Sequence, residues 1–157
     1  MPKNKFQDVI FTLMMAAVMV YGMVCYNIAL ALGGMRDEIF LMALGEWPIM
    51  MLAAVLLELV FVGRLSKWIA FRLVDPSKGG TAVMLAISAA SVWIMCPCMS
   101  LIATLLFKGG LQPGVVSTWV QTTVCNFPMA FFWQFFVAGP LVRAIFGAIF
   151  REKKAAA

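Results

Sequence analysis

Glu58 is the residue whose chemistry stands out, because its carboxylic acid lies in the middle of an apolar run from Leu52 to Gly63. Arg64 and Lys67, just after the run, are typical of a membrane surface. A carboxylate at membrane depth is costly unless it is protonated, paired or facing water, so it indicates a functional site by default. We interpret Glu58 as a protonatable residue that exchanges its proton for a cationic substrate. The alternative is a carboxylic acid that is permanently protonated, or hydrogen-bonded to another span, and serves packing alone.

A polar stripe lies on another apolar segment. Cys96, Ser100 and Thr104 follow one another at helical spacing and share one face, with Trp93 one turn before them. Pro97 removes a backbone donor and frees the carbonyl of Trp93 near the middle of the membrane. Broken helices at membrane depth often line binding sites, so the stripe is a second candidate site. The equally weighted alternative is a proline kink that neighbouring Ser and Thr side chains satisfy.

Sulfur ligands cluster in the run Met95-Cys96-Pro97-Cys98-Met99. Thiols and thioethers suit Cu(I), and a Cys-Pro-Cys run in a membrane helix resembles the motif of metal-transporting P-type ATPases. The ATP-handling domains of that family are absent from this sequence, and methionine is scattered over every apolar segment. Most methionines are therefore interpreted as adaptable packing residues. A metal site at Cys96 and Cys98 is kept as a weak alternative, and we expect no cofactor.

The composition assigns the chain to the membrane. Of its 157 residues, 64% are hydrophobic and 12% are charged, against about 25% charged residues in soluble domains. A chain of this size cannot hide so much apolar surface in a core, so its partner is the lipid bilayer. The net charge of +5 is spread over segment ends, which disfavours nucleic-acid binding. There is no histidine, and the four cysteines lie within apolar segments, so neither an enzyme nor a disulfide scaffold is favoured.

The chain contains four apolar segments, each long enough to cross a bilayer. The predicted spans are Val9–Leu32, Pro48–Phe71, Thr81–Phe107 and Pro128–Phe150. We predict short interfacial helices at Asp37–Gly45 and Val115–Asn126, since proline suits the first turn of the helix that follows each of them. The first span is longer than the apolar region of a signal peptide, so we expect it to be retained.

The positive charges predict the orientation. Ten of the twelve Lys and Arg residues lie in the polar head, the middle linker region and the tail, and the other two, Arg36 and Lys108, lie in the opposite turns. By the positive-inside rule, both termini are cytoplasmic. We predict a multi-pass protein of the bacterial cytoplasmic membrane.

The two halves of the sequence repeat each other. A shift of 76 positions places Glu58 on Gln134 and Gly63 on Gly139. The same shift aligns paired glycines, two methionine pairs and two basic residues: Gly33-Gly34 with Gly109-Gly110, Met19 with Met95, Met23 with Met99, and Lys67 with Arg143. Each half has an even number of crossings, so the halves share a topology and are related by an axis along the membrane normal.

The repeat also carries a resemblance to a known family. The stretch Gln134-Phe135-Phe136-Val137-Ala138-Gly139-Pro140-Leu141-Val142-Arg143, together with Asn27 and the head from Asn4 to Ile10, resembles an uncharacterised bacterial domain-of-unknown-function membrane family. That family is built of two tandem two-helix repeats, and the resemblance covers nearly the whole chain. It implies a fold and no established activity. The first copy departs from the pattern, with Glu58 at the position of a Gln or an apolar residue and Arg64 at the position of Pro140.

Gln134 is the predicted partner of Glu58 across the pseudo-axis, by hydrogen bonding. Asn27 and the two tyrosines Tyr21 and Tyr26 are also polar groups within a span. With Trp93 and Trp133, the tyrosines could form an aromatic lining for a lipophilic cation.

Together these patterns predict an all-α, polytopic membrane protein with four transmembrane helices arranged as two parallel-related hairpins. The predicted repeats are residues 1–75 and 76–154, and Ala155 to Ala157 is read as a remnant of cloning.

The predicted function is that of a small transporter or exporter, proton-coupled, for a hydrophobic or cationic small molecule. Its substrate and proton site comprises Glu58, Gln134, Ser100, Thr104, Asn27 and Trp93. The size is similar to that of the small multidrug exporters, which is an analogy of architecture alone. We expect a homodimer, because four helices enclose little volume. The rival function is a non-catalytic membrane subunit or scaffold whose buried polar residues only hold helices together, and an enzyme is the weakest of the three.

Overall fold

A computed structural model describes residues 5–75, 77 and 79–155, with the side chains of residues 151–155 excepted. The remaining positions, which include parts of the predicted head, linker and cloning remnant, lie outside the described residues. The described chain is helical and contains no strand. Its elements are α1 (Lys5–Leu32), α2 (Glu38–Leu57), η1 (Glu58–Val62), α3 (Gly63–Leu73), α4 (Gly80–Phe107), α5 (Val115–Phe132), η3 (Trp133–Ala138) and α6 (Gly139–Ala155).

The helices join into four long rods. α2, η1 and α3 follow one another without interruption, as do α5, η3 and α6. The four rods, Lys5–Leu32, Glu38–Leu73, Gly80–Phe107 and Val115–Phe150, are long and apolar enough to cross a membrane. The prediction of an all-α protein with four candidate spans is confirmed.

The two predicted interfacial helices are wrong as separate elements. The segment Asp37–Gly45 lies almost wholly in the first half of α2, and Val115–Asn126 is the first two thirds of α5, with Pro48 and Pro128 inside the helices. A proline removes one backbone donor, but a break in the helix would leave several backbone groups without partners in hydrocarbon. The longer rods are the less costly solution.

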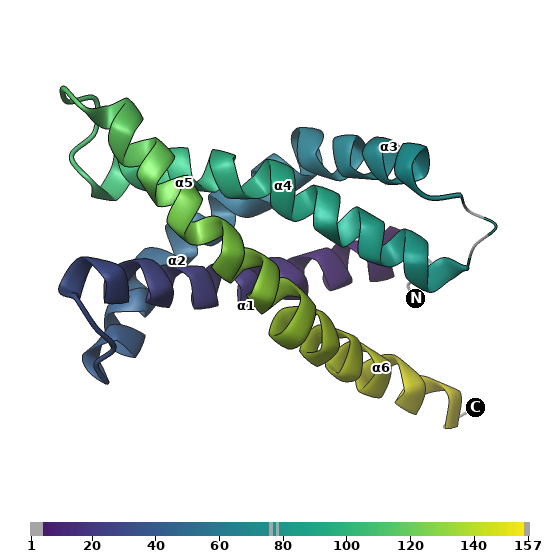
Figure 1. Ribbon diagram of the computed structural model, residues 1–157. Coiled ribbons are helices and arrows are strands. Elements are labelled where there is room, and N and C mark those ends of the chain that lie inside the picture. Colours follow the sequence, from purple (N-terminus) through teal and green to yellow (C-terminus); the bar gives the residue numbers. More distant parts are fainter. Residues whose placement is uncertain (1–4, 76, 78, 156–157) are drawn as a thin grey trace.

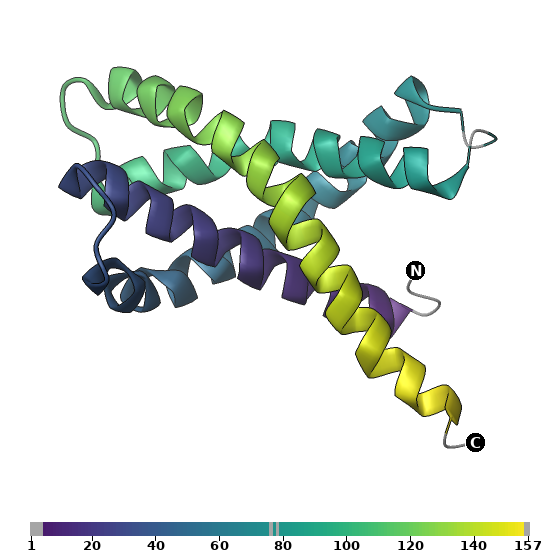
Figure 2. The same cartoon turned by 60° about the horizontal axis from the view of Figure 1, so that its bottom comes forward.

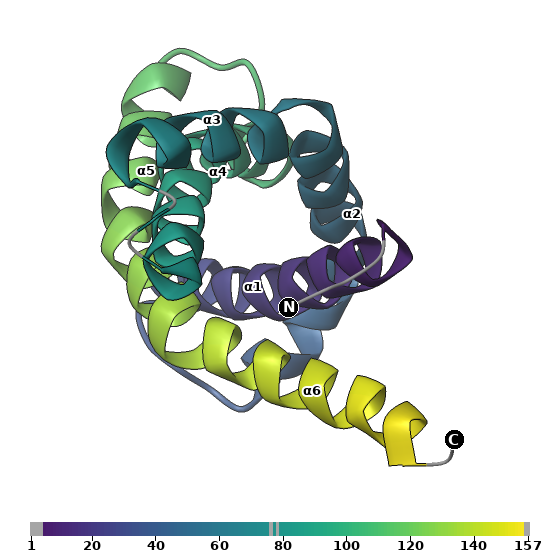
Figure 3. The ribbon, with the colours of Figure 1, turned by 90° about the vertical axis from the view of Figure 1, so that its right-hand side faces the viewer.

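The rods form two antiparallel hairpins, α1 with α2 to α3 and α4 with α5 to α6. The start of α1, the connection from α3 to α4 and the end of α6 lie at one end of the bundle, and the two tight turns lie at the other (Figure 1). These are named the terminal end and the turn end. Viewed along the bundle, the rods enclose a ring from which α6 diverges (Figure 3). Figure 2 shows the rod of α5, η3 and α6 crossing α1, which it contacts along all three elements.

Two tryptophans fix the other rods to α1. The indole N–H of Trp47 donates to the carbonyl of Ala17, and that of Trp133 donates to the carbonyl of Val18, both at 3.1 Å. Gly22 makes room for the second indole, because a Cβ at Gly22 would lie 2.3 Å from the ring of Trp133. Adjacent carbonyls of α1 therefore hold α2 of the same half through Trp47 and the second half of the chain through Trp133.

Each half contains one π-helical turn, and the two turns occupy equivalent positions of the repeat. In both, a glycine N–H bonds to the carbonyl five residues earlier, Gly63 to Glu58 and Gly139 to Gln134. A Cβ would lie 2.9 Å from that carbonyl oxygen at Gly63 and 2.7 Å at Gly139. In each π-helical turn this carbonyl oxygen lies too close to the position of a Cβ for any side chain to fit. This is why both halves have a glycine at the same position of the repeat. Turns of this kind interrupt α-helices frequently at functional sites.

The requirement for glycine can be tested at Gly139. We expect Gly139→Ala to lower the free energy of unfolding by about 1–3 kcal/mol, since the methyl group must displace the carbonyl of Gln134. The measurement is thermal unfolding of the protein in detergent. Gly147→Ala is the matched control, because nothing lies within 4 Å of its added Cβ, and this change should be neutral or stabilising by up to about 1 kcal/mol. Equal melting temperatures for the two variants would contradict the role of the glycine.

Candidate functional site

A cavity of about 440 Å³ lies between the rods, with walls from both halves of the chain. It reaches the surface at the terminal end, where the exposed residues Asp8, Arg64 and Lys67 line it. Toward the turn end its walls are the buried side chains of Ser100 and Asn126. The cavity is therefore open at one end and closed toward the other.

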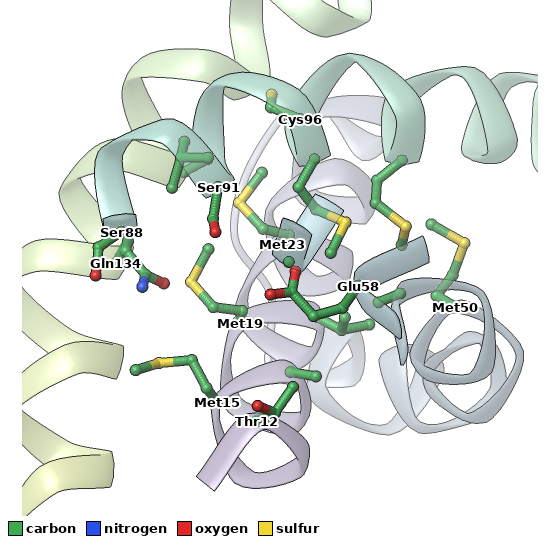
Figure 4. A pocket seen from close by; sticks show the side chains of 18 of the residues that line it. Thr12, Met15, Met19, Met23, Met50, Glu58, Ser88, Ser91, Cys96 and Gln134 are labelled. Carbon is green, nitrogen blue, oxygen red and sulfur yellow. The ribbon is translucent and has the colours of Figure 1, made fainter. Parts of the chain in front are cut away.

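Glu58 is on the wall of this cavity, half-buried, as the first residue of η1. Its side chain projects into the space lined by methionines (Figure 4). One carboxylate oxygen lies over Gly63, 3.4 Å from where a Cβ would stand, so the absence of a side chain there also accommodates the acid. No salt bridge pairs Glu58 with any Lys or Arg side chain that the structure describes. An acid in this setting is free to hold a proton or a cation.

Gln134 lies on the wall of the same cavity and is 7% exposed. Figure 4 shows it on the side of Ser88, separate from Glu58. The structure brings the repeat-matched pair to one cavity but, among its described hydrogen bonds, forms none between them. The two residues are positioned alike because each lies at the start of the π-helical turn of its own half, Glu58 as the first residue of η1 and Gln134 as the second residue of η3.

The side chains of Ser100 and Thr104 have different surroundings. Ser100 lines the cavity, and its hydroxyl accepts a hydrogen bond from the side-chain amide of Asn126 at 3.3 Å. Thr104 is 1% exposed, donates to the carbonyl of Ser100 at 2.7 Å, and does not line the cavity. Asn126 was not predicted as a site residue, because it falls in a segment that was expected to be an interfacial helix. With that boundary, Asn126 was not expected to lie inside a membrane span.

Asn27 lines the cavity toward its turn end. Its amide nitrogen donates to the carbonyl of Met23 at 2.9 Å. Trp93, in contrast, lies outside the cavity: it is 65% exposed and packs edge-on against Phe127, with ring centroids 5.4 Å apart. The indole is too large for the inner face of α4 at this level, where Val92 and Cys96 are buried instead.

The predicted aromatic lining does not surround Glu58. Tyr21, Tyr26 and Trp133 line a second, apolar hollow of about 480 Å³ near the turn end. The main cavity is lined by thioethers instead, six of the thirteen methionines: Met15, Met19, Met23, Met50, Met95 and Met99. Helical spacing made these side chains look like ordinary packing residues, and only the arrangement of the rods shows that they face one space.

Comparison with known proteins agrees with this two-part architecture. The sequence model of the family described as "Domain of unknown function (DUF2798)" matches residues 4–74 and again residues 83–150. The chain belongs to this family. The Bacillus subtilis (strain 168) protein named "Uncharacterized protein YybC" is 36% identical over 160 residues, covering 100% of this chain and 99% of that relative. No solved structure matches the chain. The resemblance inferred from the repeats is confirmed, and the match in two segments is consistent with the repeat.

In this DUF2798 protein, the two cysteines of the Cys-Pro-Cys run face different surroundings. Cys96 is buried and lines the cavity, whereas Cys98 is half-buried and does not line it. Residues two apart on a helix point about 200° from each other, so the two thiols cannot meet at one ion without unwinding α4. Among the described residues, no group of three or more His, Cys, Asp or Glu side chains could hold a metal ion. The geometry gives no support to a shared metal site at these thiols.

The different surroundings predict different reactivities. In proteins that keep either Cys96 or Cys98 as the only cysteine, we expect a charged methanethiosulfonate reagent to modify Cys96 and to leave Cys98 unmodified on the same time scale. The reagent enters the cavity from its open end and reaches Cys96, while Cys98 lies off that path. Mass spectrometry measures the modification, with complete reaction of both proteins in denaturant as the control. Faster modification of Cys98 would be inconsistent with the cavity as described.

Proposed function

We propose that this protein is a small proton-coupled transporter or exporter for a hydrophobic or cationic small molecule, with Glu58 as the coupling residue. The observation that carries the proposal is an acid without an ion-pair partner at membrane depth, on the wall of a cavity between the two halves. A half-buried carboxyl group among apolar side chains is stabilised by a proton or by a cation beside it, since either reduces the cost of the partly buried charge. Exchange of one for the other couples a proton to a substrate.

The size and lining of the cavity support a small organic substrate. Its volume of about 440 Å³ lies within the ~300–1,000 Å³ range of small-molecule sites. Methionine side chains are flexible and polarizable, and surfaces rich in them accept apolar groups of different shapes. The wall therefore combines an adaptable apolar surface with the acid Glu58 and a few amide and hydroxyl groups, and Asp8, Arg64 and Lys67 line its mouth.

The charges at the mouth of the cavity support access from the terminal end. Asp8, Arg64 and Lys67 are exposed there, so water and ions can approach Glu58 from that side. The buried side chains of Ser100 and Asn126 line the cavity toward the turn end, and this difference between its two ends is consistent with one state of an alternating-access protein.

The rival function, a non-catalytic membrane subunit or scaffold, has its own support. Buried polar groups such as Ser100, Thr104 and Asn126 form bonds within and between helices that would serve packing alone. Bonds of this kind contribute about 0.6–2 kcal/mol each in membrane proteins. The scaffold explains these bonds but leaves the cavity and its acid without a purpose. We infer that the protein is not an enzyme, because the sequence has no histidine and only Glu58 and the thiols could act as catalytic groups.

We propose that the protein lies in the bacterial cytoplasmic membrane with both termini in the cytoplasm, and that it works as a homodimer. The basic residues support the orientation, since ten of the twelve Lys and Arg residues of the sequence fall in the head, the middle linker region and the tail. A dimer is supported by the large apolar faces of the rods, on which side chains such as Leu59 (61%) and Phe136 (71%) are exposed.

The coupling role predicts the effect of removing the acid. In weakly buffered detergent solution, binding of a lipophilic cation to the native protein should release protons, and Glu58→Gln should abolish the release while the melting temperature changes little. The glutamine keeps the shape of the side chain and cannot lose a proton. A pH-indicator dye measures the release, with 2-phenylethylammonium and its N,N,N-trimethyl analogue as probes added at matched pH.

Glu46→Gln is the matched control for this experiment, because Glu46 is a half-buried acid of α2 that does not line the cavity. This variant should release protons as the native protein does. A Glu58→Gln protein that melts at a clearly lower temperature, with no release from the native protein for either probe, would favour the scaffold.

The orientation predicts the behaviour of reporter fusions. Green fluorescent protein fused to the C-terminus should fluoresce in cells, and alkaline phosphatase fused at the same point should be inactive, since the enzyme matures only outside the cytoplasm. Fusion of the phosphatase after Gly110, in the turn between α4 and α5, should reverse that result. An active phosphatase at the C-terminus would show the opposite orientation.

A further inference from the structure

Two amide oxygens toward the turn end of the cavity have no hydrogen-bond partner. Asn126 is 3% exposed and lines the cavity, and its nitrogen donates to the hydroxyl of Ser100, but its Oδ1 is buried and unpaired. Asn27 also lines the cavity, its nitrogen donates to the carbonyl of Met23, and its Oδ1 is buried and unpaired as well. An unpaired buried acceptor costs about 1–3 kcal/mol, so two of them in one cavity require an explanation.

The two asparagines lie at the same level of the bundle. The hydroxyl of Tyr26 on α1 donates to the carbonyl of Cys125 on α5 at 3.2 Å, and each asparagine is the next residue along its helix. This bond fixes the relative height of α1 and α5 at this position. Asn27 and Asn126 therefore line the cavity at the same level, one from each half of the chain.

A ligand for this place must donate hydrogen bonds and need not accept any. An organic ammonium ion fits, because –NH₃⁺ carries three donors and no acceptor. Thioethers of Met23, Met50 and Met99 line the cavity from α1, α2 and α4, and they offer an apolar surface to the hydrocarbon part.

The positive charges of the wall lie away from the asparagines. Among the described residues, the Lys and Arg that line the cavity are Arg64 and Lys67 at the terminal end, and Glu58 supplies a negative charge between that end and the asparagines. Lys108, near the turn end, is outside the cavity wall and donates to the hydroxyl of Thr122 at 3.0 Å.

We propose that the substrates of this cavity are organic amines in their protonated form, whose N–H groups donate to Oδ1 of Asn27 and of Asn126. This inference rests on the proposed function and narrows its substrate class. The asparagines form a binding position for the ammonium group, and Glu58 is the separate position at which the proton is exchanged. A quaternary ammonium ion has the same charge and no N–H group, so it leaves both oxygens unpaired.

The test compares two cations of equal charge, in one of which methyl groups replace the three N–H hydrogens, and the asparagine variants separate the loss of hydrogen bonds from the difference in size. Isothermal titration calorimetry of the purified protein in detergent gives the Kd of 2-phenylethylammonium and of its N,N,N-trimethyl analogue. We expect the native protein to bind the primary ammonium at least about tenfold more tightly, the effect of hydrogen bonds to a charged donor. Asn126→Leu and Asn27→Leu should each bring the ratio of the two Kd values close to one.

Two further variants keep the test decisive. Gln121→Leu removes an exposed amide from the same helix as Asn126 and should leave the ratio unchanged. Asn126→Asp keeps an oxygen acceptor at the position and should retain the preference for the primary ammonium, even if Asn126→Leu does not fold.

The failures of the two proposals can be told apart. If both cations bind equally and release protons in a manner that depends on Glu58, the proposed function stands and the amine site is refuted, with water as the partner of the two oxygens. The amine site is also refuted if the preference exists but neither asparagine variant alters it. If neither cation binds or releases protons, both proposals fall together.

Discussion

The structure depends on one constraint, that every backbone polar group inside a bilayer must find its partner within the protein. This constraint explains why the rods continue through Pro48, Pro97 and Pro128, where a soluble protein would more readily break its helix. It also explains why the wider part of each rod is a π-helical turn, which keeps its backbone hydrogen bonds, and not a loop. Because the rods stay intact, the two halves of the chain can differ only in their side chains and in slight changes of helix winding.

The two halves share a backbone arrangement and differ in the chemistry that they place on it. Each half has a polar residue whose carbonyl accepts the widened hydrogen bond of its π-helical turn, and the turn ends before a glycine that a side chain could not replace. Over Gly63 lies the carboxylate of Glu58, whereas over Gly139 lies the guanidinium of Arg143. One half therefore supplies an acid to the cavity and the other an amide, Gln134. Duplication gave the fold its symmetry, and the departures from that symmetry form the candidate site.

Some parts of the site were predictable and others were not. Glu58 stood out because a single acid in an apolar run has no ordinary structural reason, and Gln134 followed from the repeat. Asn126 was hidden by the interfacial helix expected before Pro128, since proline marks a helix start more often than a helix interior. The methionines of the cavity wall could not be recognised from the sequence, because apolar residues at helical spacing are found on faces toward lipid, toward the core and toward a cavity. Trp93 and Thr104 share the segment of Ser100 but point to other surroundings, which depend on neighbouring helices.

The sequence by itself determined that this is a four-span membrane protein with a repeated hairpin, because apolar length and composition leave no other solvent than lipid. It also determined the family, through motifs that recur at a fixed shift. Only the tertiary structure decided which polar groups share a space, that Glu58 and Gln134 line one cavity without bonding, and that two asparagines from different halves leave their oxygens unpaired. The physical reason is that the face a helix turns to a cavity depends on how neighbouring rods pack, and packing among equally apolar faces is decided by a few contacts, such as Trp133 over Gly22.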